Sequence, residues 1–169
     1  MIHMFAVGLV LLFTLYTSFA IVISKSSFLL KLVALVTFVA GLVLLLQRDT
    51  FLPFLGRMAL PPTVLKDAVY PPHSNSEVDL SFNVPDGTKV VYWGAKPSNT
   101  VVPNPWDAYG DFTNAGVAIV VGGRATLRFA CPSKYQVGSF RRTLNRHIHY
   151  RICDERGMIG SVQTRFVKC

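Results

Sequence analysis

Charged side chains are almost absent from the first 47 residues of this 169-residue chain, which contain no Asp or Glu and only two basic residues, Lys25 and Lys31. The remaining 122 residues carry 15 Lys or Arg and nine Asp or Glu, an ordinary composition for a globular domain. This distribution excludes a purely cytosolic protein, a multi-span transporter and a disordered chain. It predicts a membrane anchor followed by one domain of about 120 residues, which is a common domain size.

Two N-terminal segments are apolar enough to cross a bilayer. Residues 4–24 contain 21 consecutive uncharged residues, and a bilayer core needs about 20. Residues 28–47 can also cross if Lys31 extends its ammonium group to the headgroups. Because only residues 25–27 separate them, we expect a hairpin of two transmembrane helices, about 4–24 and 28–47, with both chain ends on one side. A cleaved secretory signal is the alternative, although the first segment lacks the basic start and short apolar core of such a signal.

Signals of the cellular compartment are also scarce. The chain has no Asn-x-Ser/Thr glycosylation sequon, and its three cysteines, Cys131, Cys153 and Cys169, are odd in number and lack Cys-x-x-Cys spacing. We therefore predict neither a disulfide framework nor a zinc site, and both absences favour a domain that faces the cytosol. Basic residues flank both ends of the second apolar segment, so the membrane orientation stays open.

Beyond the apolar segments the sequence predicts a tether and then strands. Five prolines within residues 48–73 predict an irregular tether with one short helix around residues 63–68. Downstream, apolar and polar residues alternate, with Gly, Pro and Asp turn signals between the alternating runs. No helical period competes with this pattern. Residues 74–169 are therefore predicted to form an all-β antiparallel sandwich.

Basic side chains gather in the last 46 residues, which carry ten Lys or Arg against two acidic residues. Such a surface suits phospholipid headgroups or acidic protein neighbours, and the alternative is that the charge serves solubility. No nucleic-acid reader motif accompanies the charge, so no specific nucleic-acid partner is expected. The arginines assigned to a partner-binding surface are Arg128, Arg141, Arg142, Arg146 and Arg151.

One predicted strand contains a His-x-His pair, His147 and His149. Strand alternation places both imidazoles on one face, with Ile148 and Tyr150 on the other. Two imidazoles at this spacing can reach one metal ion. The pattern alone is weak, because two histidines on the polar face of a strand are more often solvated side chains.

The residues around the pair resemble the C-terminal half of the intradiol ring-cleavage dioxygenases. The family motif runs Gly-x-Tyr-x-Phe, Pro-x-x-Tyr, a His-Ile-His-aromatic strand and a Gln-x-aromatic-Phe strand. The similar segments here are residues 123–129, 132–135, 147–150 and 163–166, with an upstream strand that ends in Trp93. The resemblance spans about residues 76–167 and implies an intradiol-like sandwich.

This resemblance also implies a site. In the family, two tyrosinates and two histidines bind a non-haem Fe(III) that activates a catechol for oxygen insertion between its hydroxyls. Carried over residue by residue, the metal ligands would be Tyr109, Tyr135, His147 and His149, and Gln163 would be an active-site amide. The chain departs from the family three positions before the first histidine, where an arginine that assists charge development is replaced by Leu144.

The whole arrangement is similar to that of short membrane proteins encoded by large icosahedral double-stranded DNA viruses, particularly those that infect algae. The likeness includes the two apolar segments, the juxtamembrane residues 47–56 and the small intradiol-like domain. It implies a minor capsid protein anchored in the internal membrane of the virion, with its domain facing the capsid. We therefore expect a structural virion protein that needs no cofactor and links the membrane to the capsid through its basic surface. The alternative is a membrane-tethered Fe(III) intradiol-like dioxygenase acting on a catechol-type aromatic.

Overall fold

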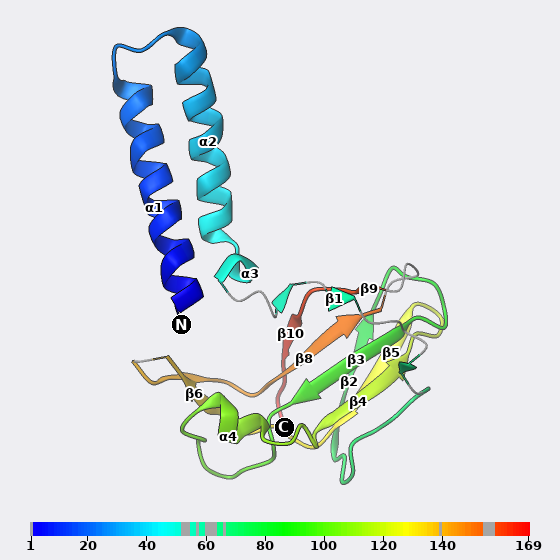
Figure 1. The fold of residues 1–169 in the computed structure, drawn as a ribbon. Helices are drawn as coiled ribbons and strands as arrows, with labels where there is room; N and C mark the ends of the chain where they lie inside the picture. The colour runs from blue at the N-terminus through cyan, green and yellow to red at the C-terminus, as the bar shows by residue number, and fades with distance from the viewer. Residues whose placement is uncertain are drawn as a thin grey trace. The chain divides into compact units, whose positions relative to one another are not determined.

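The computed structural model describes residues 2–51, 55–56, 58–59, 64–65, 67–138, 140–153 and 158–169. The chain divides into two compact units, Met1–Gly56 and Arg57–Cys169 (Figure 1). The first unit is helical and the second is built from strands. Each unit is described by itself.

The helical unit is a hairpin of α1 (Ile2–Ile23) and α2 (Phe28–Leu46), followed by the short α3 (Arg48–Phe51). Ser27 caps α2, because its hydroxyl accepts a hydrogen bond from the N–H of Leu30. Phe19 and Phe38 pack across the hairpin with ring centroids 6.2 Å apart. The predicted pair of apolar helices is confirmed, and each is long and apolar enough to cross a membrane. Near an N-terminus the same features also fit a signal sequence.

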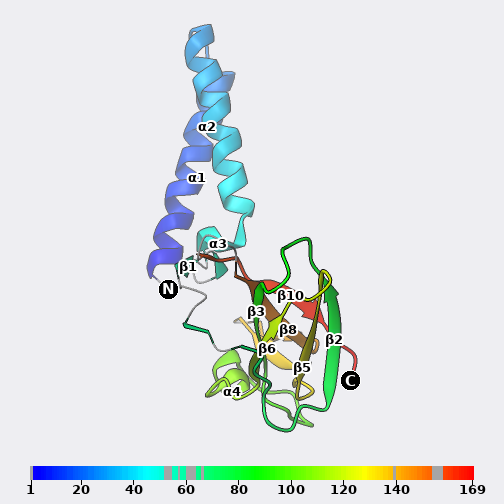
Figure 2. The ribbon, with the colours of Figure 1, turned by 90° about the vertical axis from the view of Figure 1, so that its right-hand side faces the viewer.

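The second unit contains ten strands within the described residues, and every strand pair is antiparallel, as the alternating sequence predicts. A four-stranded sheet has the order β10-β8-β3-β4, and three two-stranded pairs are β2-β5, β6-β7 and β1-β9 (Figures 1 and 2). The bounds are β1 (Met58–Ala59), β2 (Ser76–Ser81), β3 (Lys89–Gly94), β4 (Ala115–Ile119), β5 (Arg124–Phe129), β6 (Tyr135–Val137), β7 (Arg142–Leu144), β8 (His147–Ile152), β9 (Met158–Ile159) and β10 (Gln163–Phe166). One short helix, α4 (Pro105–Tyr109), lies beside β6.

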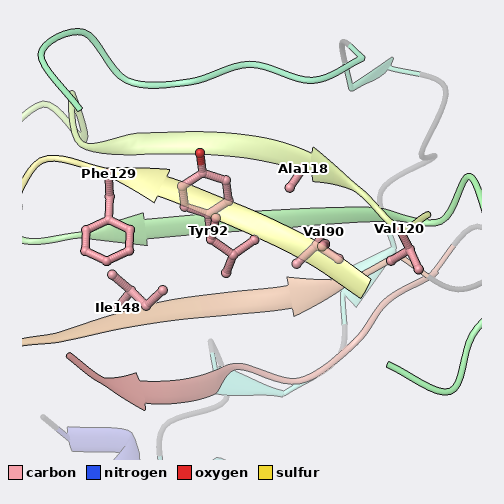
Figure 3. Close-up of a cluster of buried hydrophobic side chains, with 8 residues drawn as sticks. Val90, Tyr92, Ala118, Val120, Phe129 and Ile148 are labelled. Atoms are coloured by element: carbon pink, nitrogen blue, oxygen red, sulfur yellow. The ribbon is translucent and has the colours of Figure 1, made fainter. Parts of the chain in front are cut away.

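The main core is formed by apolar side chains from the four-stranded sheet and from β5, as Figure 3 shows. Tyr92 is its largest buried member, and its hydroxyl donates a hydrogen bond of 2.7 Å to the carbonyl of Arg128. Burial raises the pKa of Tyr92 to about 12. Gly116 lies against the Tyr92 hydroxyl and the Val69 carbonyl, so closely that a Cβ atom there would clash with both. The polar end of Tyr92 therefore fits only because β4 has no side chain at that point.

Two cysteines form a disulfide, which the sequence did not predict. Cys131 and Cys169 are bonded, while Cys153 is a buried thiol. The prediction of no disulfide was wrong because it relied on the odd cysteine count and the missing motif. A single pair that is 38 residues apart depends only on tertiary proximity. The inference of a cytosol-facing domain loses its support, since disulfides persist in oxidising compartments.

The end of the predicted tether is attached to the β unit. Val69 and Val117 exchange backbone hydrogen bonds of 2.8 Å in both directions, so Val69 pairs with β4. The Lys89 ammonium donates to the carbonyl of Leu65 at 2.6 Å and lies 3.3 Å from the carboxylate of Asp67. The short helix predicted around residues 63–68 falls partly outside the described residues. These contacts place part of residues 48–73 with the strands.

Candidate metal centre

Four side chains from three separate segments come together at the end of the domain where α4 and β6 lie side by side (Figure 1). They are Tyr109 at the end of α4, Tyr135 at the start of β6, and His147 and His149 on β8. The hydroxyls of Tyr109 and Tyr135 are 2.8 Å apart, and the Tyr135 hydroxyl is 3.0 Å from Nε2 of His147. The rings of His147 and His149 are 4.8 Å apart, and those of Tyr109 and His149 are 6.0 Å apart. All four ligands suggested by the family resemblance therefore belong to one cluster.

The two phenols are positioned by the short elements that carry them. Tyr109 belongs to α4, and Tyr135 belongs to β6. The Asn104 side chain caps α4 by accepting a hydrogen bond from the N–H of Asp107, and Pro105 occupies the first turn. Val102 fixes the start of β6, since its N–H donates to the Lys134 carbonyl and its carbonyl accepts from the N–H of Gln136, both at 2.9 Å. Tyr135 also packs with Ala95 and Ala108 in a small apolar cluster. Tyr109 and Tyr135 thus meet edge to face with ring centroids 5.4 Å apart.

The tautomer of the neutral His147 imidazole follows from its partners. Its Nδ1 lies 2.6 Å from the Asn145 carbonyl, and a carbonyl only accepts, so Nδ1 carries the proton. Nε2 then accepts from the Tyr135 hydroxyl, which in turn accepts from Tyr109. Burial lowers the pKa of His147, and the Asn145 carbonyl partly opposes that shift. The imidazole therefore presents a lone pair to the phenols.

The environment of Tyr109 favours the neutral form of its phenol. Burial raises the pKa of Tyr109 far above its ordinary value, and the hydrogen bond with Tyr135 raises it further. Tyr135 is only 4% exposed, so both hydroxyls lie in a poorly solvated site. A bound cation would reverse this preference, because a metal ion is the largest local charge and favours ionised ligands. Two phenols, one buried and one partly buried, beside two imidazoles are thus a donor set that fits a hard, highly charged metal ion.

The two histidines are also contacted by residues that were not assigned as site residues. Its Nδ1 lies 3.0 Å from Oγ1 of Thr164, and its ring lies 5.6 Å from that of Trp93. Phe166, two residues further along β10, packs edge to face against His147 at 5.8 Å. The register explains both contacts, since Thr164 is paired with His149 and Phe166 with His147. The sequence signal that could have identified Thr164 and Phe166 was strand alternation. If Gln163 lies on one face of β10, Thr164 and Phe166 lie on the other.

The proposed role of Gln163 does not agree with this register. Gln163 is paired with Tyr150, whose ring packs on the main core. Residues directly opposite in an antiparallel pair share a face, so Gln163 lies on the face away from both histidines. The register therefore does not bring Gln163 together with the four-residue cluster. Leu144, at the position of the family arginine, is paired with Tyr135 and packs on the small apolar cluster.

The five arginines assigned to a partner-binding surface do not form one surface. Arg141 and Arg142 are exposed at the turn between β6 and β7. Arg128 is exposed on β5, where it lies 3.4 Å from the Glu77 carboxylate. Arg146 is partly buried and donates to the Cys169 carbonyl at 2.5 Å.

Arg151 does not belong on any outer surface. It is only 6% exposed and donates to the Gly160 carbonyl at 2.8 Å. Its guanidinium also lies over the Trp93 ring at 6.0 Å. Arg151 is therefore buried, because alternation turns this residue to the face that carries the histidines and Gly160, directly after β9, accepts its hydrogen bond.

Comparisons with known proteins do not add to this picture. No protein-family model matches the chain, and no curated protein matches it. Among the described residues, no group of three or more His, Cys, Asp or Glu side chains is placed to hold a metal ion. A metal at this site therefore depends on the two phenols as well as the two imidazoles.

Proposed function

We propose that this chain is a membrane-anchored protein whose β domain, an intradiol-type sandwich, binds ferric iron through Tyr109, Tyr135, His147 and His149. The observation that carries the proposal is the convergence of these four side chains, from α4, β6 and β8, into one polar cluster in which Tyr135 and His147 are buried and Tyr109 and His149 are partly buried. They were assigned from a motif resemblance, and they are spread over 41 positions of sequence. The long apolar helices support the membrane anchor.

The donor set determines which metal and which chemistry suit the site. Phenolate oxygens are hard ligands that favour the ferric state, and imidazoles complete the ligand set. When bound, the iron would supply a Lewis-acidic and redox-active centre for a catechol-type aromatic. The chain itself orients the site: Asn145 fixes the ring of His147, and burial excludes water from Tyr135. Tyr109 and Tyr135 each release a proton when they become ligands, so iron binding is expected to strengthen as pH rises.

Loading the full chain with Fe(III) in detergent micelles tests this function. Tyrosinate bound to Fe(III) absorbs visible light, so the wild-type protein should be coloured and contain one iron per chain. Tyr135→Phe and Tyr109→Phe should each weaken or shift that band. Tyr92→Phe is the matched control, because Tyr92 is also a buried hydrogen-bonded tyrosine but belongs to the main core. A colourless, iron-free wild type would contradict the proposal.

A second function is favoured by a different observation, the exposed turn between β6 and β7. Phe140 is 99% exposed there, next to the exposed Arg141 and Arg142. An apolar tip beside two cations suits an acidic protein neighbour. Leu144 also replaces the arginine that assists catalysis in the family the chain resembles. We propose on this basis a structural role, in which the domain links a virion membrane to its capsid.

Photo-crosslinking separates the structural role from the catalytic one. A photoreactive phenylalanine at position 140 should crosslink to an acidic capsid protein in assembled particles, and one at position 121 should not. Val121 is a suitable control because it is exposed at the turn between β4 and β5. If the protein is found only in host membranes and forms no crosslink to a capsid protein, the structural role is excluded. Oxygen consumption with catechol by the iron-loaded chain would instead favour the dioxygenase.

A further inference from the structure

The two histidines of the cluster are oriented in different ways. His147 is held by the carbonyl of Asn145, which is only two residues away on the same strand. The Nδ1 of His149 lies 3.0 Å from the hydroxyl of Thr164 on β10. One ring is therefore oriented by local backbone and the other by a side chain 15 residues away.

We propose that Thr164 is a positioning residue for His149: its hydroxyl accepts the Nδ1–H hydrogen bond and so directs Nε2 toward the cluster. This inference rests on the proposed metal site. A histidine that binds a metal through one nitrogen commonly donates its other N–H to an oxygen, which fixes the tautomer and the ring orientation. Asn145 already does this for His147, so Thr164 completes the same arrangement for the second imidazole.

The position of Thr164 suits this role. Thr164 is directly opposite His149 in the β8-β10 register, so the hydroxyl and the ring share one face of the sheet. Threonine is branched at Cβ and has few χ1 rotamers, so its hydroxyl is held in place better than that of serine. Its side chain is exposed, so burial alone gives no reason for a threonine here.

The strand that carries Thr164 is fixed at its far end. The N–H of Val167 donates to the Arg146 carbonyl at 3.1 Å, directly after β10. Two residues later, Cys169 is bonded to Cys131. Phe166 also packs against His147 from the same strand. These contacts hold β10 in the register that the Thr164 hydrogen bond needs.

The decisive measurement uses the metal-free full chain, labelled with ¹⁵N-histidine in detergent micelles. Wild-type His149 should show the Nδ1–H tautomer by its ring nitrogen shifts. Thr164→Val removes the hydroxyl at nearly constant shape, and His149 should then become a mixture of tautomers. Thr164→Ser should restore the wild-type tautomer. The ring of His147 is an internal control and should not change, because a backbone carbonyl holds it.

Competition with nitrilotriacetate for Fe(III) gives the second readout. Thr164→Val should weaken iron binding about 10-fold to 100-fold, the usual cost of losing a hydrogen bond to a metal ligand, whereas Thr164→Ser should stay within about threefold of wild type. Thr126→Val is the matched control, since this strand hydroxyl donates to Asp79 on another part of the domain.

The two readouts separate failure of this inference from failure of the proposed function. An unchanged tautomer in Thr164→Val overturns the positioning role, whether or not the protein binds iron. A wild type that binds no iron overturns the proposed function. The tautomer of His149 in the metal-free protein then still shows whether Thr164 is its hydrogen-bond partner. Equal iron affinity of wild type and Thr164→Val also overturns the positioning role.

Discussion

The helical unit and the β unit are stabilised by opposite kinds of surroundings. Most large apolar side chains of α1 and α2 point outward, including Phe5, Phe13 and Phe28, so little of their surface is covered by the protein itself. In the β unit the large apolar side chains turn inward onto Tyr92 and Phe129. The comparison teaches that the outward apolar surface of the helices suits an apolar solvent, while the strands depend on contacts that the chain makes with itself.

Breaking the disulfide is expected to have the largest effect, and only on the β unit. Cys131→Ser with Cys169→Ser should lower its unfolding free energy by about 4 kcal/mol, the chain-entropy value for a loop of this length. Both tryptophans, Trp93 and Trp106, belong to this unit, so denaturation followed by tryptophan fluorescence reports on it alone.

Cys153→Ala is the control for this experiment, because it removes a buried thiol and leaves the disulfide intact. Its cost should be about 1 kcal/mol, the transfer and cavity cost of a small group. The helical circular dichroism of α1 and α2 should persist in every variant. Equal stability of the double variant and wild type would show that the disulfide adds nothing to the fold.

Adding one methyl group to a glycine of each unit sharpens the comparison further. Gly116→Ala should destabilise the β unit by about 3 kcal/mol, because the new Cβ clashes with the Val69 carbonyl and the Tyr92 hydroxyl. Gly41→Ala in α2 should cost less than about 1 kcal/mol, since its Cβ would meet only the flexible end of Leu15 at 3.2 Å. Thermal unfolding of the two variants in the same detergent measures the difference. A larger loss for Gly41→Ala would show that the helices pack more tightly than the strands.

Alkaline pH should produce the smallest of the three effects. The folded pKa of Tyr92 is about 12, above the ordinary tyrosine value of 10.0 in the unfolded chain. The unfolded chain therefore loses this proton first, so the stability contribution is complete below pH 10 and declines as pH rises to 12. By pH 12 the decline should reach about 2 kcal/mol, because each pKa unit corresponds to about 1.4 kcal/mol and the loss is still incomplete at the folded pKa. Tyr92→Phe should remove that part of the decline, which urea unfolding at pH 8 to 12 can measure; an identical slope in both proteins would contradict the assignment.

Much of the fold could be predicted because its signals are local. An uninterrupted apolar run specifies a helix of membrane length, and alternation specifies the faces of a strand. Alternation also placed His147 and His149 on one face, away from Ile148. The same rule applied to β10 turns Gln163 away from the histidine face and Thr164 toward it, whereas the motif alone had selected Gln163.

Other features depended on proximity between distant segments. Arg151 is polar and was placed outside, yet it is buried beside Trp93. Cys131 and Cys169 gave no spacing signal, yet they are bonded. Neither outcome is encoded in neighbouring residues, because each depends on which segments the sheet register brings together.

The sequence by itself determined the two apolar helices, the strand character of the remainder and the residue types that a ferric site would need. Only the tertiary structure decided that Tyr109 meets Tyr135 and His147, that Thr164 meets His149 and that β10 is held by a disulfide. The physical reason is the range of the interactions. Helix length and strand alternation arise from neighbours along the chain, whereas a binding site arises from hydrogen bonds between segments that meet only after the sheet has formed.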